Sequence, residues 1–143
     1  MPNIDKLNIM EKIKNFFSSN DKFARECGIE LVSVEEGKAV ARMYVDSRHH
    51  NGVNTAHGGA IFTLGDFAFA TASNSYGNVA VAINVSISYI KAHTKGYLYA
   101  YATELSKNPK LGCYTVEIKN EANELVAIFQ GMVYRKKDSL PIT

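Results

Sequence analysis

The segment from residue 58 to residue 76 constrains the fold most, because it is apolar almost all the way round. Its large side chains are separated mainly by small ones; they are Ile61, Phe62, Leu64, Phe67 and Phe69. A helix without a polar face is buried on all sides. We expect Gly77 to end this helix, and the rest of the chain must surround it.

Alternation of apolar and polar residues predicts strands before and after that helix. Four segments follow it, at 81–89, 97–102, 114–119 and 125–135. A hairpin precedes it, with strands at 29–34 and 38–46 around Glu36-Gly37. Consecutive strands joined by short turns imply an antiparallel meander. We therefore predict an α+β fold, with an antiparallel sheet wrapped around one long buried helix.

The first part of the chain predicts an additional N-terminal helix at residues 3–19, where apolar residues recur at helical spacing. Asp21 is the expected cap of a short turn that ends at Gly28. With 143 residues, 46% of them hydrophobic, the chain is long enough for one domain with its own core. We divide it into an N-terminal helical extension (1–24), a main domain (25–137) and a C-terminal tail (138–143).

Charge and cysteine content exclude several classes of protein. The formal net charge of +2 leaves no basic surface typical of nucleic-acid binding. Charged residues near the start argue against a signal peptide. Asp66 interrupts the longest apolar stretch, which is too short to span a bilayer, so no membrane partner is expected. Cys27 and Cys113 form no disulfide or C-x-x-C pattern, which indicates reduced thiols and a cytoplasmic location.

Asp66 is the first candidate functional residue, because it lies in the middle of the most apolar helix. A carboxylate is costly to bury unpaired. Its neighbours one turn away are Phe62 and Ala70, so no local cation pairs with it. Two interpretations stay open, a functional carboxylate and a buried aspartate hydrogen-bonded to the backbone.

The second candidate is His57-Gly58-Gly59 at the start of the helix. Glycines there allow a ligand to approach the free amides, and these with the helix dipole suit an oxyanion hole. Gly58 and Asp66 are eight residues apart, so a continuous helix separates them by about 12 Å. One chain cannot bring both to one carbonyl. Either they belong to unrelated sites, or a second copy in a symmetric dimer supplies the other half.

These residues belong to a longer pattern that resembles the hotdog-fold acyl-CoA thioesterases of the phenylacetic-acid-degradation (PaaI-like) group. The matching positions are Asn51, His57-Gly58-Gly59, Phe62, Leu64-Gly65-Asp66, Ala68-Phe69-Ala70, Asn74, Ala80-Val81 and Ile87-Ser88-Tyr89. The likeness covers about residues 25–135. It implies the hotdog fold, hydrolysis of an aryl- or short- to medium-chain acyl-CoA, and a homodimer or dimer of dimers, hence a homotetramer.

The resemblance also implies roles for individual residues. Asp66 corresponds to a nucleophile or general base, Gly58 to the oxyanion-hole amide, and His57 and Asn51 to side chains that position the thioester and water. The strand from Asn84 to Tyr89 corresponds to the lining of the CoA channel. The substrate-binding candidates are Gly59, Asn84, Val85, Ser86 and Lys91. No cofactor is expected, since CoA enters only as part of the substrate and product.

The sequence departs from the family pattern in three places. Ala82 stands where some relatives have Ser, and Lys91-Ala92 where relatives often place a proline after the basic residue. Gly65 occupies a helix-interior position at a cost of about 1 kcal/mol, which suggests a close contact with another helix.

Other functions and sites stay open as alternatives to this assignment. A hydratase or dehydratase of the same fold would need an acid–base pair such as His57 and Asp66. A non-catalytic acyl-CoA-binding module is the third alternative. A metal site is not expected, because His49, His50, His57 and Asp46 match no common zinc spacing. His93 and the basic run at 135–137 are either solvated or in contact with phosphate.

Three tyrosines alternate along one predicted strand, at Tyr97, Tyr99 and Tyr101, so they share one face of it. They are either ordinary half-exposed side chains or a contact between subunits.

Overall fold

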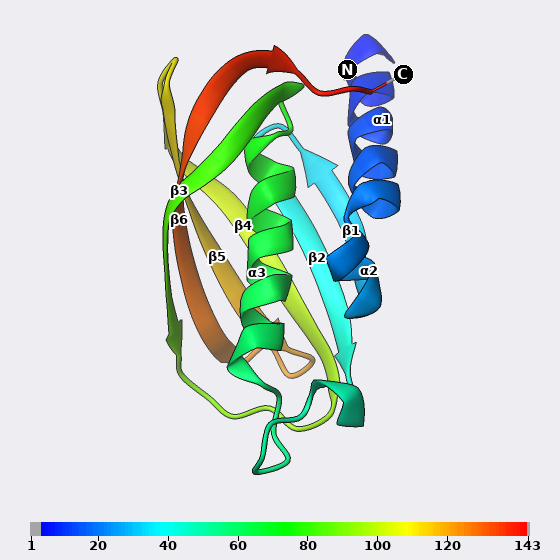
Figure 1. Ribbon diagram of the computed structural model, residues 1–143, viewed down its shortest axis with the longest axis vertical. Coiled ribbons are helices and arrows are strands. Elements are labelled where there is room, and N and C mark those ends of the chain that lie inside the picture. The colour runs from blue at the N-terminus through cyan, green and yellow to red at the C-terminus, as the bar shows by residue number, and fades with distance from the viewer. Residues whose placement is uncertain (1–3, 143) are drawn as a thin grey trace.

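A computed structural model describes residues 4–142, and a six-stranded antiparallel sheet curves around the central helix α3 (Figure 1). The helices are α1 (Ile4–Asn20), α2 (Lys22–Glu26), the short 3₁₀ helix η1 (Ser47–His49) and α3 (Gly58–Ser73). The strands are β1 (Ile29–Glu35), β2 (Lys38–Val45), β3 (Asn78–Tyr89), β4 (Gly96–Lys107), β5 (Leu111–Asn120) and β6 (Leu125–Ser139). This is the hotdog fold, and the predicted fold class is confirmed.

The strand order is β1-β2-β4-β5-β6-β3, which corrects the prediction of a simple meander after the helix. β3 and β4 follow one another in sequence but do not pair; β3 lies at the edge beside β6, and β4 lies beside β2. The connection between them passes below the start of α3 (Figure 1). It is held there by the Ala56 amide, which donates to the His93 carbonyl at 2.8 Å.

The ends of several elements also differ from the prediction. α3 ends at Ser73, three residues before the predicted end, because the Asn74 side chain bonds backbone groups on both sides. Its amide donates to the Ala70 carbonyl, and its carbonyl accepts from the Ala80 amide. β6 continues to Ser139, two residues into the expected tail 138–143. Asp21 caps α2 as expected, by accepting from the Ala24 amide at 3.0 Å.

The core lies between α3 and the concave face of the sheet. Gly65 faces the strands: an added Cβ would stand 3.1 Å from both Ile118 and Phe129. The close contact expected there is therefore with the sheet rather than with another helix. None of the helices within residues 4–142 has both the length and the apolar character needed to cross a bilayer.

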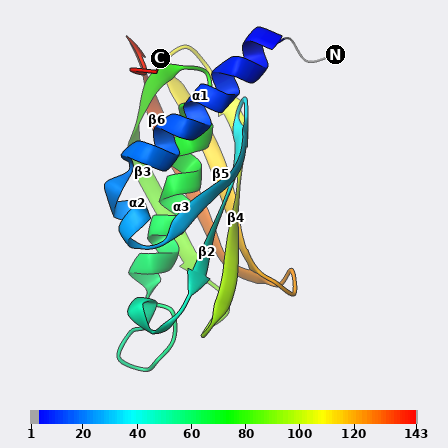
Figure 2. The same ribbon diagram turned by 90° about the vertical axis from the view of Figure 1, so that its right-hand side faces the viewer.

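All helices lie on one side of the sheet, as the side view in Figure 2 shows. The opposite face carries Tyr97, Tyr99 and Tyr101, whose neighbouring rings have centroids 5.9 and 6.4 Å apart. Tyr101 is 40% exposed. The three side chains thus form a partly exposed stripe, and their role as a subunit contact stays a prediction. The predicted division into extension, domain and tail also stays a prediction, although α1 packs beside β1 and buries Ile13 completely.

Replacing Gly131 with Ala should lower the free energy of unfolding by about 1–3 kcal/mol, since it overpacks the core. The added Cβ would lie 2.6 Å from Cζ of Phe69, which is a buried core residue, 1% exposed. Chemical denaturation measures the change. Gly52→Ala is the control, because no heavy atom of residues 4–142 beyond its chain neighbours lies within 4 Å of its added Cβ. Equal stabilities of the two variants would contradict the packing argument.

Candidate active site

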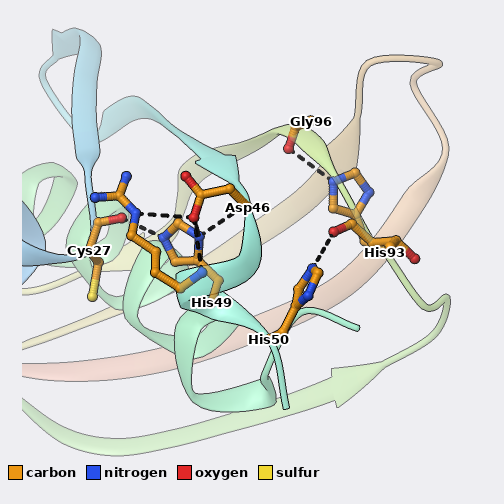
Figure 3. A network of polar contacts seen from close by, with 8 residues as sticks. Cys27, Asp46, His49, His50, His93 and Gly96 are labelled. Carbon is orange, nitrogen blue, oxygen red and sulfur yellow. Dashed lines mark hydrogen bonds and ion pairs between the residues drawn. The ribbon is translucent and has the colours of Figure 1, made fainter. Parts of the chain in front are cut away.

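The polar loop before α3 is fixed by a buried histidine, His49 (Figure 3). Its Nδ1 accepts from the Asp46 amide at 3.1 Å, so Nε2 carries the proton and donates to the Cys27 carbonyl at 2.7 Å. The His49 carbonyl in turn accepts from the His57 amide at 2.7 Å. The loop is therefore tied to α2 at one end and to the start of α3 at the other.

His57 caps α3 with its side chain. Its backbone is extended, and its Nδ1 accepts from the Gly59 amide at 2.8 Å. The Gly58 amide donates to no group among residues 4–142. Within the described residues, the positive end of the helix dipole thus coincides with an amide that has no acceptor, at the residue assigned to the oxyanion hole.

Asn51 shapes the loop that leads to α3. Its side-chain oxygen accepts from the amides of Val53 and Thr55 at 3.0 and 3.2 Å, and its nitrogen donates to the Thr55 hydroxyl at 3.0 Å. These contacts stabilise a compact turn. Contact between Asn51 and a thioester or a water molecule stays a prediction.

Asp66 is half-buried near the middle of α3. Its carboxylate makes no hydrogen bond or ion pair within the part of the chain that the structure describes. The interpretation of Asp66 as a buried aspartate hydrogen-bonded to the backbone is therefore wrong. Burial raises the pKa of the Asp66 carboxyl, and the negative charge of Asp21 raises it further. α3 is continuous from Gly58 to Ser73, so the expected separation of about 12 Å holds.

The structure separates the five candidate substrate-binding residues. Gly59 lies beside His57, and Lys91 forms an exposed ion pair with Glu124 at 2.6 Å. Val85 pairs with Gly131, whose Cα faces the Phe69 ring of the core. Side chains alternate along a strand, so Asn84 and Ser86 point to the opposite face of the sheet. They line a separate hollow of about 380 Å³ there, next to Gln130 and Met132.

Two hollows lie on either side of the start of α3. One, of about 400 Å³, is lined by His57, Gly59 and Thr63 together with Phe23 and Cys27 of the N-terminal region. The other, of about 360 Å³, is lined by Asn51, Gly58, Tyr89, Lys91 and His93.

The sequence analysis placed Tyr89 in the strand that corresponds to the lining of the CoA channel, but it gave this residue no role of its own. It lies at the end of β3, and its hydroxyl donates to the Gly58 carbonyl at 2.8 Å. Alternation with Val85 and Ile87 was the signal that could have placed its side chain on the helix-facing side of the sheet.

The histidines of this region bind neighbouring protein groups. His50 and His93 each bond a backbone carbonyl, of Thr94 at 2.7 Å and of Gly96 at 3.0 Å (Figure 3). Among residues 4–142, no group of three or more His, Cys, Asp or Glu side chains is arranged to hold a metal ion.

Comparison with known proteins agrees with this geometry. Residues 53–127 match the family model described as the thioesterase superfamily. The segment contains the whole of α3 with Asp66, and the strands β3, β4 and β5. The chain therefore belongs to the thioesterase superfamily.

Individual relatives place it more narrowly. It is 38% identical over 117 residues to the acyl-coenzyme A thioesterase PaaI of Escherichia coli K12, covering 81% of this chain and 84% of that protein. A putative esterase of Archaeoglobus fulgidus is 42% identical over 139 residues, covering 96% and 90%. The solved structure of E. coli PaaI superposes with a TM-score of 0.87 at 34% identity, covering 92% of this chain and 98% of that one. The resemblance to the PaaI-like group is confirmed.

Proposed function

We propose that this protein hydrolyses acyl-CoA thioesters to a free acid and CoA. The observation that carries the proposal is a pair of groups on α3 that have no hydrogen-bond or ion-pair partner among residues 4–142. They are the Gly58 amide and the half-buried Asp66 carboxylate, and both lie within the thioesterase-superfamily segment. The relative from E. coli is named an acyl-coenzyme A thioesterase, and a related structure from Streptococcus mutans UA159 was solved bound to acetyl CoA, at 26% identity and a TM-score of 0.74 over 78% of this chain and 91% of that one.

The chemistry follows from these two groups. Water attacks the thioester carbonyl carbon while ionised Asp66 takes one of its protons, and the Gly58 amide binds the oxygen that becomes negative. The tetrahedral intermediate then expels the CoA thiolate, which takes a proton, and the acid is released. In the alternative route Asp66 attacks the carbon directly, and the C–S bond breaks to release the CoA thiolate, which takes a proton. Water then hydrolyses the resulting mixed anhydride, which frees the acid and restores Asp66. Mass spectrometry after rapid quenching distinguishes the routes, because only the second leaves the acyl group on Asp66.

A second copy of the chain is needed to complete each site. Gly58 and Asp66 lie about 12 Å apart on one helix, too far to act on one carbonyl. β3 is an edge strand with exposed Val81 and Ile83, whereas α1 lies beside the other edge strand, β1. An exposed apolar edge favours pairing with another chain. We propose a homodimer through β3, and a dimer of dimers in which the stripe of Tyr97, Tyr99 and Tyr101 is the further contact.

The proposed substrate is an aryl- or short- to medium-chain acyl-CoA. Phe23 is 66% exposed at the rim of the hollow beside His57, so the first hollow has an apolar wall available to an acyl group.

Cys27 and Cys113 are free thiols, which supports a cytoplasmic location.

The test is a panel of aryl-, short- and medium-chain acyl-CoA esters with a thiol-reactive dye. We expect free CoA to be released from at least one class, with kcat in the range of about 1–1000 per second that is common for enzymes. With a 3-hydroxyacyl-CoA included in the panel, enoyl absorbance without thiol release would instead identify a hydratase or dehydratase. Tight binding without any reaction would identify a binding module. Either of these results would overturn the proposal.

A further inference from the structure

Tyr89 makes a contact with the start of α3 that packing alone does not require. Its hydroxyl donates to the Gly58 carbonyl at 2.8 Å, across 31 positions of sequence. Its ring lies so close to Gly58 that an added Cβ would stand 3.0 Å from both Cζ and the hydroxyl oxygen. The end of β3 is therefore fitted against the helix start, and a side chain at position 58 would press on the Tyr89 ring.

The Gly58 carbonyl belongs to the same peptide unit as the Gly59 amide. A peptide unit is planar, so a contact that holds its C=O also sets the direction of its N–H. The Gly59 N–H donates to Nδ1 of His57 at 2.8 Å. Three groups are thus connected in series, the Tyr89 hydroxyl, the Gly58–Gly59 peptide and the His57 ring.

This series determines where the His57 proton lies. Nδ1 accepts a hydrogen bond from an amide, so it carries no proton in the neutral ring, and the proton is on Nε2. His57 lines the first hollow, so Nε2–H is a donor available to a ligand there. Burial raises the pKa of the Tyr89 phenol, which keeps the hydroxyl protonated and able to donate.

We propose that Tyr89 is a positioning residue for thioester hydrolysis, which acts through the Gly58–Gly59 peptide to keep the His57 ring oriented with Nε2–H toward the substrate. The inference rests on the proposed function for its catalytic consequence, but the orientation of His57 exists without substrate. Tyr89 itself is 52% exposed, so loss of its hydroxyl removes the hydrogen bond without opening a cavity in the core.

The test compares Tyr89→Phe with Tyr134→Phe. Tyr134 is a similarly exposed tyrosine, 43% exposed, whose hydroxyl has no partner among residues 4–142. We expect Tyr89→Phe to lower kcat on the order of tenfold with KM changed less than about twofold, because a small misplacement of a catalytic group slows the reaction more than binding. Tyr134→Phe should match the wild type in both constants.

Nitrogen-15 NMR of the histidine rings gives the second measurement, without substrate and under mildly alkaline conditions. His57→Gln identifies the His57 signals by their loss. In the wild type these signals should report a proton on Nε2, and in Tyr89→Phe they should move toward a mixture of the two neutral tautomers. A lower kcat with an unchanged tautomer would overturn the proposal, as would a changed tautomer with unchanged kcat.

The two measurements separate this inference from the proposed function. If the wild type released no thiol from any substrate of the panel, the proposed function would fail, and the catalytic part of this inference with it. If the wild type is active and Tyr89→Phe matches it in kcat, KM and the His57 spectrum, the role of Tyr89 alone is overturned.

Discussion

Replacing Asp66 with Asn should lower kcat for thioester hydrolysis by about a thousandfold, because the amide can neither take a proton from water nor attack the carbonyl. KM should change little, since Asn has nearly the same shape and Asp66 makes no hydrogen bond or ion pair among residues 4–142 that the change would break. Steady-state kinetics with the best substrate of the panel measures both constants. Retained turnover in Asp66→Asn would exclude Asp66 as the base or nucleophile.

Asp21→Asn is the matched control for that experiment. Asn also caps helices well, so α2 should persist. The negative charge of Asp21 raises the pKa of Asp66, so its removal should lower that pKa. Asp66 would then stay ionised to lower pH, and the acid limb of the rate profile should shift toward lower pH while kcat at neutral pH stays the same. A loss of activity comparable with that of Asp66→Asn would contradict the distinct roles of the two acids.

Asp66 also links activity to stability. The pKa of Asp66 is raised in the folded state, so the folded chain favours the protonated carboxyl. The stability that protonated Asp66 contributes is therefore fully present below the ordinary pKa of an aspartate. It is lost as the pH rises through the raised pKa of Asp66 in the folded state. Asp66→Asn cannot ionise, so it should be more stable than the wild type at neutral pH, and the difference should shrink as the medium is acidified. Such a cost at neutral pH is consistent with a residue retained for chemistry.

The sequence was sufficient to predict the features that depend on local pattern. The apolar character of residues 58–76 identified the buried helix, and the unpaired Asp66 within it identified the candidate acid. The length of the helix between Gly58 and Asp66 was enough to show that one chain cannot bring both groups to one carbonyl. Each of these inferences needs only neighbours in sequence and the geometry of a helix.

Features that depend on long-range contacts were not predictable in this way. The pairing of β3 with β6 joins segments far apart in the chain, and no local pattern distinguishes it from pairing with β4. The face occupied by Asn84 and Ser86 depends on this register and on the irregularity between Ala82 and Asn84. The hydrogen bond from Tyr89 to Gly58 likewise follows from the place of β3 in the sheet.

Gly58→Pro should abolish most activity by removing the amide proposed for the oxyanion hole. Proline suits this position, because the first residue of a helix needs no amide bond and His57 already has the extended backbone that precedes proline. We expect kcat to fall about a hundredfold or more. Gly58→Ala is the control, since it adds a Cβ against Tyr89 but keeps the amide, and it should retain much more activity. Equal losses would assign the effect to crowding.

Mixing the two inactive chains tests where each half-site comes from. If Gly58 of one chain acts with Asp66 of its partner, a heterodimer of Gly58→Pro and Asp66→Asn contains one site with both changes and one site with neither. Chains that are unfolded together and refolded in equal amounts should therefore recover about a quarter of the wild-type activity, because half of the dimers are mixed and each mixed dimer has one intact site. If both groups came from a single chain, every chain would be defective. The mixture would then stay as inactive as its components, and the two-chain site would be excluded.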